Sequence, residues 1–199
     1  MRNSRCLART TRLIPWLVAA SFAITGSAFA DNGFLGVFFD ANAQNCAGDV
    51  PSLATLYLCF QPSGSSSGGI TGAEYRIESN DANYTFLGAT SIIDYALVGD
   101  PLNGTIGFLS GCQSGGTIAI LQFTVRNFGG SHDAEVHVVA KRPPSNQFFP
   151  CPLVVLCDSP TLTKVCVESG KTILNPSVRG PCGSGREQTE WSRVKSLYR

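Results

Sequence analysis

Four side chains with metal-ligand chemistry lie within six residues of one another: His132, Asp133, Glu135 and His137. Two imidazoles and a carboxylate are a set that zinc accepts. Alternation would put Glu135 and His137 on one outward strand face, beside a turn carrying the other two. Because the chain has only two histidines, and they form no helical H-x-x-x-H pair, solvated surface residues are the simpler interpretation.

A second group has the oxygen ligands that calcium prefers. The first three members have the one-three-five spacing of a calcium loop: Asp40, Asn42 and Gln44, with Asp49 nearby. The regular loop requires Gly at its sixth position and Glu at its twelfth, where this chain has Asn45 and Pro51. The alternative is a polar turn whose Asp and Asn side chains bond their own backbone. We expect no cofactor, with calcium here as the alternative.

Two motifs resemble catalytic signatures without their context. The GSSSG stretch at 64–68 fits G-x-S-x-G, but it lies in a Ser/Gly tract typical of a flexible loop, whereas a nucleophile elbow joins a strand to a helix. The Gly-Lys-Thr at 170–172 has Val165 where a phosphate loop needs glycine. No nucleophile–base pair stands out elsewhere. A non-enzymatic function is favoured, and a secreted metal-dependent hydrolase using the two histidines is the alternative.

Residues 1–30 are typical of a secretory signal peptide. Four arginines precede an apolar stretch over 13–29, and Ala28-Phe29-Ala30 forms an A-x-A cleavage site. A membrane anchor is disfavoured because Pro15 and Gly26 interrupt a short apolar core. The sequence therefore predicts an exported protein, in the periplasm, at the cell surface or outside the cell, with no membrane span after cleavage.

Charge is distributed unevenly along the remaining chain. Residues 31–178 hold 6 basic and 12 acidic residues, a net charge of 6 − 12 = −6. Residues 179–199 hold 5 basic and 2 acidic residues, a net charge of 5 − 2 = +3. An acidic main domain argues against nucleic-acid binding, which needs a basic surface. The partner is expected to be a protein or a glycan at the cell surface.

Seven cysteines follow the signal: Cys46, Cys59, Cys112, Cys151, Cys157, Cys166 and Cys182. An exported chain enters an oxidising compartment, so disulfides are expected, and the odd number predicts one free thiol. Spacing does not determine the pairing. Cys157 with Cys166, across a hairpin, and Cys112 with Cys151 are two suggestions among many.

Short apolar or alternating runs separated by Gly, Pro, Asn and Ser fill residues 31–178. The expected strands cover residues 34–39, 53–60, 70–78, 84–88, 117–125, 135–140, 153–156, 162–167 and 171–174, with 91–98 as either a strand or a helical turn. In 70–78, Glu74, Arg76 and Glu78 would face solvent. Such a pattern predicts an all-β fold, an antiparallel sandwich of immunoglobulin type or a small barrel.

The run 117–125 is the best candidate for a central strand. Its apolar phase changes between Ile120 and Leu121, which predicts either burial on both faces or a β-bulge. The Asn-Phe-Gly-Gly-Ser segment at 127–131 has hairpin-turn composition. The run is therefore expected to pair antiparallel with 135–140.

Residues 179–199 are predicted to form a linker and a short C-terminal helix. Thr189 would cap it, and its apolar side chains fall at helical spacing: Trp191, Val194, Leu197 and Tyr198. Two interpretations stay open. The helix is either a docking or sorting segment, or it closes one edge of the sandwich.

The spacing of several short motifs over nearly the whole mature chain resembles a group of exported bacterial proteins of unknown function. The motifs that carry the resemblance are Val37-Phe-Phe-Asp40, Cys46, Ala73 to Ile77, Thr85 to Gly88, Gly111-Cys112, Cys151-Pro152, Val155 to Cys157, Lys164 and Ile173 to Asn175 through to Cys182. The segment Trp191 to Arg199 is also similar to the ending of such proteins, with Ser192 in place of Gly. The resemblance implies an exported β-sandwich, loosely similar to cohesin-type or immunoglobulin-like modules, with no active site to carry over.

The resemblance also indicates that Cys59 and Cys166 are an extra pair particular to this chain. The favoured function is a binding, adhesion or cell-envelope module. A carbohydrate-binding module is a further alternative, and it would need an exposed aromatic platform drawn from residues such as Tyr84, Tyr95 or Phe148.

Overall fold

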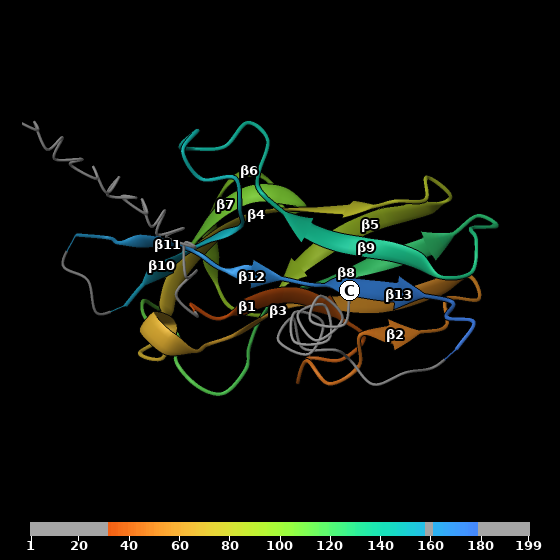
Figure 1. Cartoon of the computed structure of the whole chain (residues 1–199), viewed down its shortest axis with the longest axis horizontal. Helices are drawn as coiled ribbons and strands as arrows, with labels where there is room; N and C mark the ends of the chain where they lie inside the picture. Colours follow the sequence, from red (N-terminus) through yellow and green to blue (C-terminus); the bar gives the residue numbers. More distant parts are fainter. Residues whose placement is uncertain (1–31, 158–160, 179–199) are drawn as a thin grey trace, which may run out of the picture.

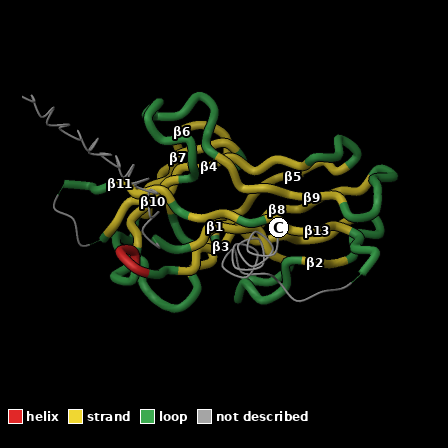
Figure 2. The backbone as a smooth tube through the Cα atoms, in the orientation of Figure 1, coloured by secondary structure: helices red, strands yellow, loops and turns green. Residues whose placement is uncertain are grey.

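The computed structural model describes residues 32–157 and 161–178, which form two β-sheets and one short 3-10 turn, η1, at Gly64–Ser66 (Figure 2). The strands are β1 (Phe34–Phe38), β2 (Ala47–Gly48), β3 (Leu53–Gln61), β4 (Ile70–Ser79), β5 (Tyr84–Ser91), β6 (Tyr95–Asp100), β7 (Asn103–Phe108), β8 (Ile118–Asn127), β9 (Ala134–Val139), β10 (Leu153–Leu156), β11 (Lys164–Cys166), β12 (Glu168–Ser169) and β13 (Lys171–Leu174). The predicted signal and C-terminal helix lie outside the described residues.

The two sheets pack face to face as a sandwich (Figure 1). Sheet A has the order β12-β1-β3-β8-β5. Sheet B has the order β11-β10-β4-β9-β13-β2, with β7 joined to β4 and β6 to β7. The all-β class and the sandwich are confirmed. No helix among the described residues has the length and apolar composition needed to cross a membrane.

The core lies between the sheets and follows the alternation of the strands. In β3, Leu56, Leu58 and Phe60 point inward and are fully buried. Tyr75 of β4 enters from the other sheet, and its buried hydroxyl donates to the Pro101 carbonyl at 2.9 Å. Satisfying that hydroxyl matters because an unpaired buried polar group is costly.

The phase change in β8 is a β-bulge. Leu121 lies opposite Leu58 and Ala119 opposite Cys59, so Ile120 is an extra residue with no partner in β3. One inserted residue lets the apolar side chains on both sides of it face the core. The predicted irregularity is therefore confirmed as a bulge.

The expected hairpin between 117–125 and 135–140 is wrong. β8 pairs with β3 on one edge and β5 on the other, so it has no free edge for β9. β9 lies in sheet B between β4 and β13. Asn127 turns the chain by accepting hydrogen bonds from the backbone of Gly129 and Gly130, at 2.9 and 2.6 Å. The turn connects the two sheets instead of two neighbouring strands.

The sandwich is also not purely antiparallel. β12 runs parallel to β1 in sheet A, and β13, one residue later, runs parallel to β2 in sheet B. The segment therefore crosses from one sheet to the other at Gly170. The Thr172 hydroxyl is buried there and donates to the Val37 carbonyl, which ties the two sheets together.

The cysteines pair differently from the two suggestions. Cys112 is bonded to Cys157, with Cα atoms 5.4 Å apart, and Cys151 to Cys166, with Cα atoms 5.6 Å apart. The 153–166 hairpin exists, but its register sets Cys166 opposite Leu153 and therefore near Cys151.

Cys59 is free and buried, so the suggested extra pair with Cys166 is also wrong. The expectation of one free thiol holds among the described cysteines. Cys46 is disulfide-bonded as well.

Candidate functional site

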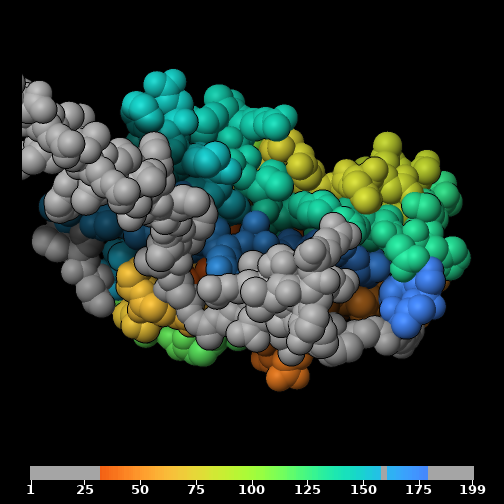
Figure 3. Space-filling view, viewed as in Figure 1, coloured from red at the N-terminus to blue at the C-terminus, as the bar shows by residue number. Residues whose placement is uncertain are grey.

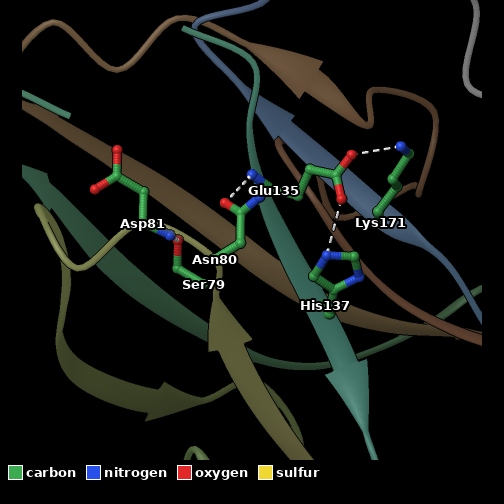
Figure 4. A network of polar contacts seen from close by, with 6 residues as sticks. All are labelled: Ser79, Asn80, Asp81, Glu135, His137 and Lys171. Atoms are coloured by element: carbon green, nitrogen blue, oxygen red, sulfur yellow. Dashed lines mark hydrogen bonds and ion pairs between the residues drawn. The ribbon is translucent and has the colours of Figure 1, made fainter. Parts of the chain in front are cut away.

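The outer face of sheet B is charged, and its charges are paired with one another. Figure 4 shows the Glu135 carboxylate between Lys171 Nζ, at 2.5 Å, and His137 Nε2, at 3.0 Å. The hydrogen bond from Lys171 lowers the pKa of Glu135 below its usual range. The Arg76 guanidinium likewise lies 2.5 Å from the Glu78 carboxylate. This face carries the ion pairs of an ordinary solvated surface.

The four candidate zinc ligands on this face do not converge. Glu135 and His137 are joined to each other, but the Asp133 carboxylate accepts from the backbone and hydroxyl of Ser177, and His132 Nδ1 lies 3.1 Å from the Asn175 carbonyl. Within residues 32–157 and 161–178, no three His, Cys, Asp or Glu side chains are grouped where they could hold a metal ion.

The candidate calcium ligands form the polar turn that was the alternative. The Asp40 carboxylate accepts from the backbone amides of Asn42, Gln44 and Asn45, at 2.6 to 3.2 Å, and from the Asn45 side chain at 2.7 Å. N–H donors thus already occupy its lone pairs. Asp49 lies beyond β2, on an exposed position. Asn42 and Gln44 contribute backbone amides to Asp40.

Glu74 was expected to face solvent, and that expectation is wrong. It is only 4% exposed, because the segment after β9 folds over it. Ser145 donates to its carboxylate from both backbone and hydroxyl, and Thr105 donates at 3.1 Å. Burial alone would raise the pKa of Glu74, but these hydrogen bonds outweigh it and the pKa is lowered.

The cluster around Glu74 includes Lys164 Nζ, 3.1 Å from Ser145 Oγ, so a serine, a lysine and a carboxylate meet there. A serine nucleophile needs a neighbouring base that takes its proton. A carboxylate with a lowered pKa is a weak base, and its oxygens are fully engaged. The arrangement serves to fasten the 141–152 segment onto β4.

The outer face of sheet A has a different character, because it is almost uncharged. The strands β1, β3, β5 and β8 contain a single charged residue, Arg126. Register places six outward side chains side by side, and we call them the platform: Tyr57, Gln122 and Thr90 in one row, and Thr55, Thr124 and Leu87 in the next. Thr55, Leu87 and Thr90 are exposed.

One end of this face is hollowed into a groove of about 300 Å³. Its lining consists of Phe34, Gly36, Val37 and Phe38 of β1, Ala43, Gln44 and Cys46 of the following loop, Gln61, and Gly170 with Lys171 at the sheet crossing. The Phe34 and Phe38 rings lie 6.1 Å apart. The groove is thus apolar at its centre and polar at its rim.

Cys59 lies beside the groove, packed with Phe38 and Ala43 in a small apolar cluster outside the main core. Burial raises the pKa of its thiol to about 12, and the nearby Asp40 carboxylate adds to the effect. A thiol with this pKa is protonated at neutral pH, and the thiolate is the reactive form. Cys59 therefore acts as a small apolar side chain.

The aromatic residues suggested for carbohydrate binding do not form a flat, exposed aromatic surface. Tyr84 is 4% exposed, and its hydroxyl donates to the Ser131 carbonyl at 2.9 Å. Tyr95 is half-buried and Phe148 is 81% exposed. Tyr84 thus belongs to the core.

Comparison with solved structures gives distant likenesses to cohesin modules. One is the cohesin module from a Clostridium perfringens family 33 glycoside hydrolase, with 13% identity over 74% of this chain and 99% of that module, and a TM-score of 0.49. Another is the sixth cohesin of Acetivibrio cellulolyticus scaffoldin B, solved with a Cel5 dockerin, with 12% identity over 73% of this chain and 99% of that one, and a TM-score of 0.47.

A non-cellulosomal cohesin from the archaeon Archaeoglobus fulgidus is similar over 81% of this chain and 97% of that one, with 8% identity and a TM-score of 0.40. No protein-family model and no curated protein matches the sequence.

Proposed function

We propose that this protein is an exported, non-enzymatic module that binds another protein through the platform on sheet A. The observation that carries the proposal is the contrast between the two outer faces. Sheet B presents paired charges, whereas the four long strands of sheet A present hydroxyl, amide and apolar groups with one guanidinium.

Covering an uncharged face costs less free energy than covering a charged one. Buried charges need exact partners, whereas hydroxyl and amide groups can exchange water for a partner's hydrogen bonds. The centres of protein interfaces are accordingly depleted in charged residues. Leu87, 39% exposed at the β5 edge of the platform, supplies apolar area for contact.

Export is supported by the disulfides Cys112–Cys157 and Cys151–Cys166, because such bonds persist in oxidising compartments. It agrees with the signal-like residues 1–30. A binding module in that compartment would act at the cell envelope or in adhesion outside the cell.

Site-specific photo-crosslinking tests the platform. A photoreactive phenylalanine analogue replaces Thr124 of the platform or, as the control, Glu78 on the outer face of sheet B. Each variant is irradiated in an envelope and medium extract of the producing cells. We expect a discrete protein adduct from position 124 that position 78 does not give.

Adducts of equal yield from both positions, or from position 78 alone, would contradict the assignment of the binding face. Adducts that contain glycan and no protein would show that the partner is a carbohydrate and would contradict the proposal of a protein partner. Thr124→Lys should remove the adduct when the crosslinker is placed at the neighbouring Gln122.

A further inference from the structure

The disulfide of Cys46 points to a segment beyond the described residues. Two disulfides use four other cysteines, and Cys59 is free. Because Cys46 is bonded, its remaining candidates within the chain are Cys6 and Cys182. Cys6 belongs to the predicted export signal, which is removed on secretion. Elimination therefore leaves Cys182.

The described end of the chain already runs beside Cys46. The Ile173 amide donates to the Cys46 carbonyl at 2.8 Å, and the Asn175 amide donates to the Gly48 carbonyl at 2.9 Å. Residues 179–182 span up to roughly 14 Å when extended, which sets the reach of a turn back toward Cys46. Their Gly-Pro pair suits such a turn.

The point from which the C-terminal segment leaves is fixed. The Ser177 amide donates to the Asp133 carboxylate at 2.8 Å, and the Ser177 hydroxyl donates to the same group. In Figure 3 the blue residues at the end of the described chain lie against the blue-green turn before β9. The residues after 178 therefore start at a defined place near β2.

Cys46 is itself part of the groove lining, beside Gln44 and near Phe34 and Phe38. A disulfide at this position would hold the chain that follows at the mouth of the groove. Seventeen residues follow Cys182, and they include four apolar side chains at helical spacing: Trp191, Val194, Leu197 and Tyr198. An apolar stripe of this kind needs an apolar surface to cover it.

Charge favours the same placement. Residues 179–199 carry +3, and the domain from 31 to 178 carries −6. A tethered, oppositely charged segment has a high effective concentration at its site, so even weak contacts hold it there.

We infer that the C-terminal segment is the occupant of the groove, tethered by a Cys46–Cys182 disulfide. The inference does not rest on the proposed function, because it is argued from the cysteines, the chain ends and the charges; the groove and the platform adjoin, with Phe38 opposite Tyr57 in the register. The groove is then completed by this chain itself.

Disulfide mapping under non-reducing conditions tests the tether. Proteolysis of the secreted full chain should give one peptide joining Cys46 to Cys182, and reduction should split it. Cys46 joined to any other cysteine would overturn the tether. A disulfide-linked dimer on a non-reducing gel would show that a second copy supplies the partner, and would overturn it too.

Tryptophan fluorescence tests the docking separately. The chain has two tryptophans, so Trp16→Phe leaves Trp191 as the single reporter even where the signal is retained. We expect a blue-shifted native emission and several-fold weaker acrylamide quenching than in the unfolded chain. An emission that is the same in the native and unfolded chains would overturn the docking, whatever the disulfide map shows.

Paired variants place the reporter in this groove. Phe34→Asp changes the groove wall, and Gln44→Lys adds a like charge at an exposed rim position where folding is not at risk. Both should shift the Trp191 emission to the red. The matched controls Phe148→Asp and Gln147→Lys, on an exposed loop, should not. A shielded Trp191 that neither groove variant affects would show that the segment docks elsewhere.

Discussion

At the residue scale, burial decides what each reactive side chain can do. Cys59 carries a free thiol, yet it is fully buried beside Phe38, and its Sγ lies 3.7 Å from the Ala41 carbonyl. Glu74 is a carboxylate with every oxygen engaged by Ser145 and Thr105. Both residues have reactive chemistry in principle and structural roles in this fold.

Cys59 should not react with maleimide in the native protein, because burial raises the pKa of its thiol to about 12 and excludes the reagent. Unfolding without reductant should expose it, and peptide mapping should find the label on Cys59. Cys59→Ser is the control that loses this label. Rapid labelling of Cys59 in the folded protein would contradict the prediction.

Glu74→Gln should destabilise the protein by about 1–3 kcal/mol at neutral pH, because the hydrogen bonds to a charged carboxylate are lost. The folded-state pKa of Glu74 is lowered, so its contribution is complete above the unfolded pKa of about 4.3 and is lost as pH falls through the folded pKa. The difference between wild type and variant should therefore shrink in acid.

Urea unfolding at neutral pH and at about pH 3, below the unfolded pKa, measures this difference. Glu78→Gln is the control on the same strand, since Glu78 belongs to a surface ion pair with Arg76 and should change stability by less than about 1 kcal/mol. An equal effect of both substitutions would show that Glu74 has no special role.

At the element scale, the two disulfides cross-link chain segments at or near the ends of strands. Cys112 follows β7 and Cys157 follows β10, and the Gln113 and Ile70 backbones exchange two hydrogen bonds beside this bond. Cys151–Cys166 closes the β10–β11 hairpin at its open end. Cys112–Cys157 holds the end of the sandwich at which β4 begins, and Cys151–Cys166 lies further along β4, beyond the Leu153–Glu74 pair.

Removing Cys112–Cys157 by paired alanine substitution should cost more than removing Cys151–Cys166. The sequence separations are 45 and 15 residues, and loop entropy predicts losses of about 4 and about 3 kcal/mol. Guanidinium unfolding of the two double variants under the same conditions provides the comparison. A larger loss for the shorter loop would mean that contacts, and not chain entropy, dominate.

At the scale of the whole molecule, our proposal places partner binding on the outer face of sheet A, whereas the core that stabilises the fold lies against its inner face. The inward face carries Leu56, Leu58 and Phe123, which are buried in the core, whereas the platform faces outward. The groove at one end of the same face is reserved for the C-terminal segment in our proposal.

Thr124→Lys should therefore abolish partner binding and leave the free energy of unfolding within about 0.5 kcal/mol of wild type. Thermal unfolding and the crosslinking assay, run on the same preparation, measure the two effects. Phe123→Ala, one residue away but inward, should lose about 3–5 kcal/mol because it leaves a core cavity. A large loss of stability for Thr124→Lys would show that the face is not separable from the core.

The sequence by itself determined the all-β class, most strand positions and the bulge in β8, because alternation and turn residues are local properties of the chain. It also contained the signal for the platform: the strands of sheet A have almost no charge, and this was visible in the outward positions of 53–61 and 118–127.

Only the tertiary structure decided which strands are neighbours and which side chains meet. It gave both edges of β8 to β3 and β5, set Cys166 near Cys151, and covered Glu74 with a segment more than sixty residues away. The physical reason is the same in each case. Pairing, disulfide register and burial depend on contacts between distant segments, and a period read along one strand holds no information about what covers it.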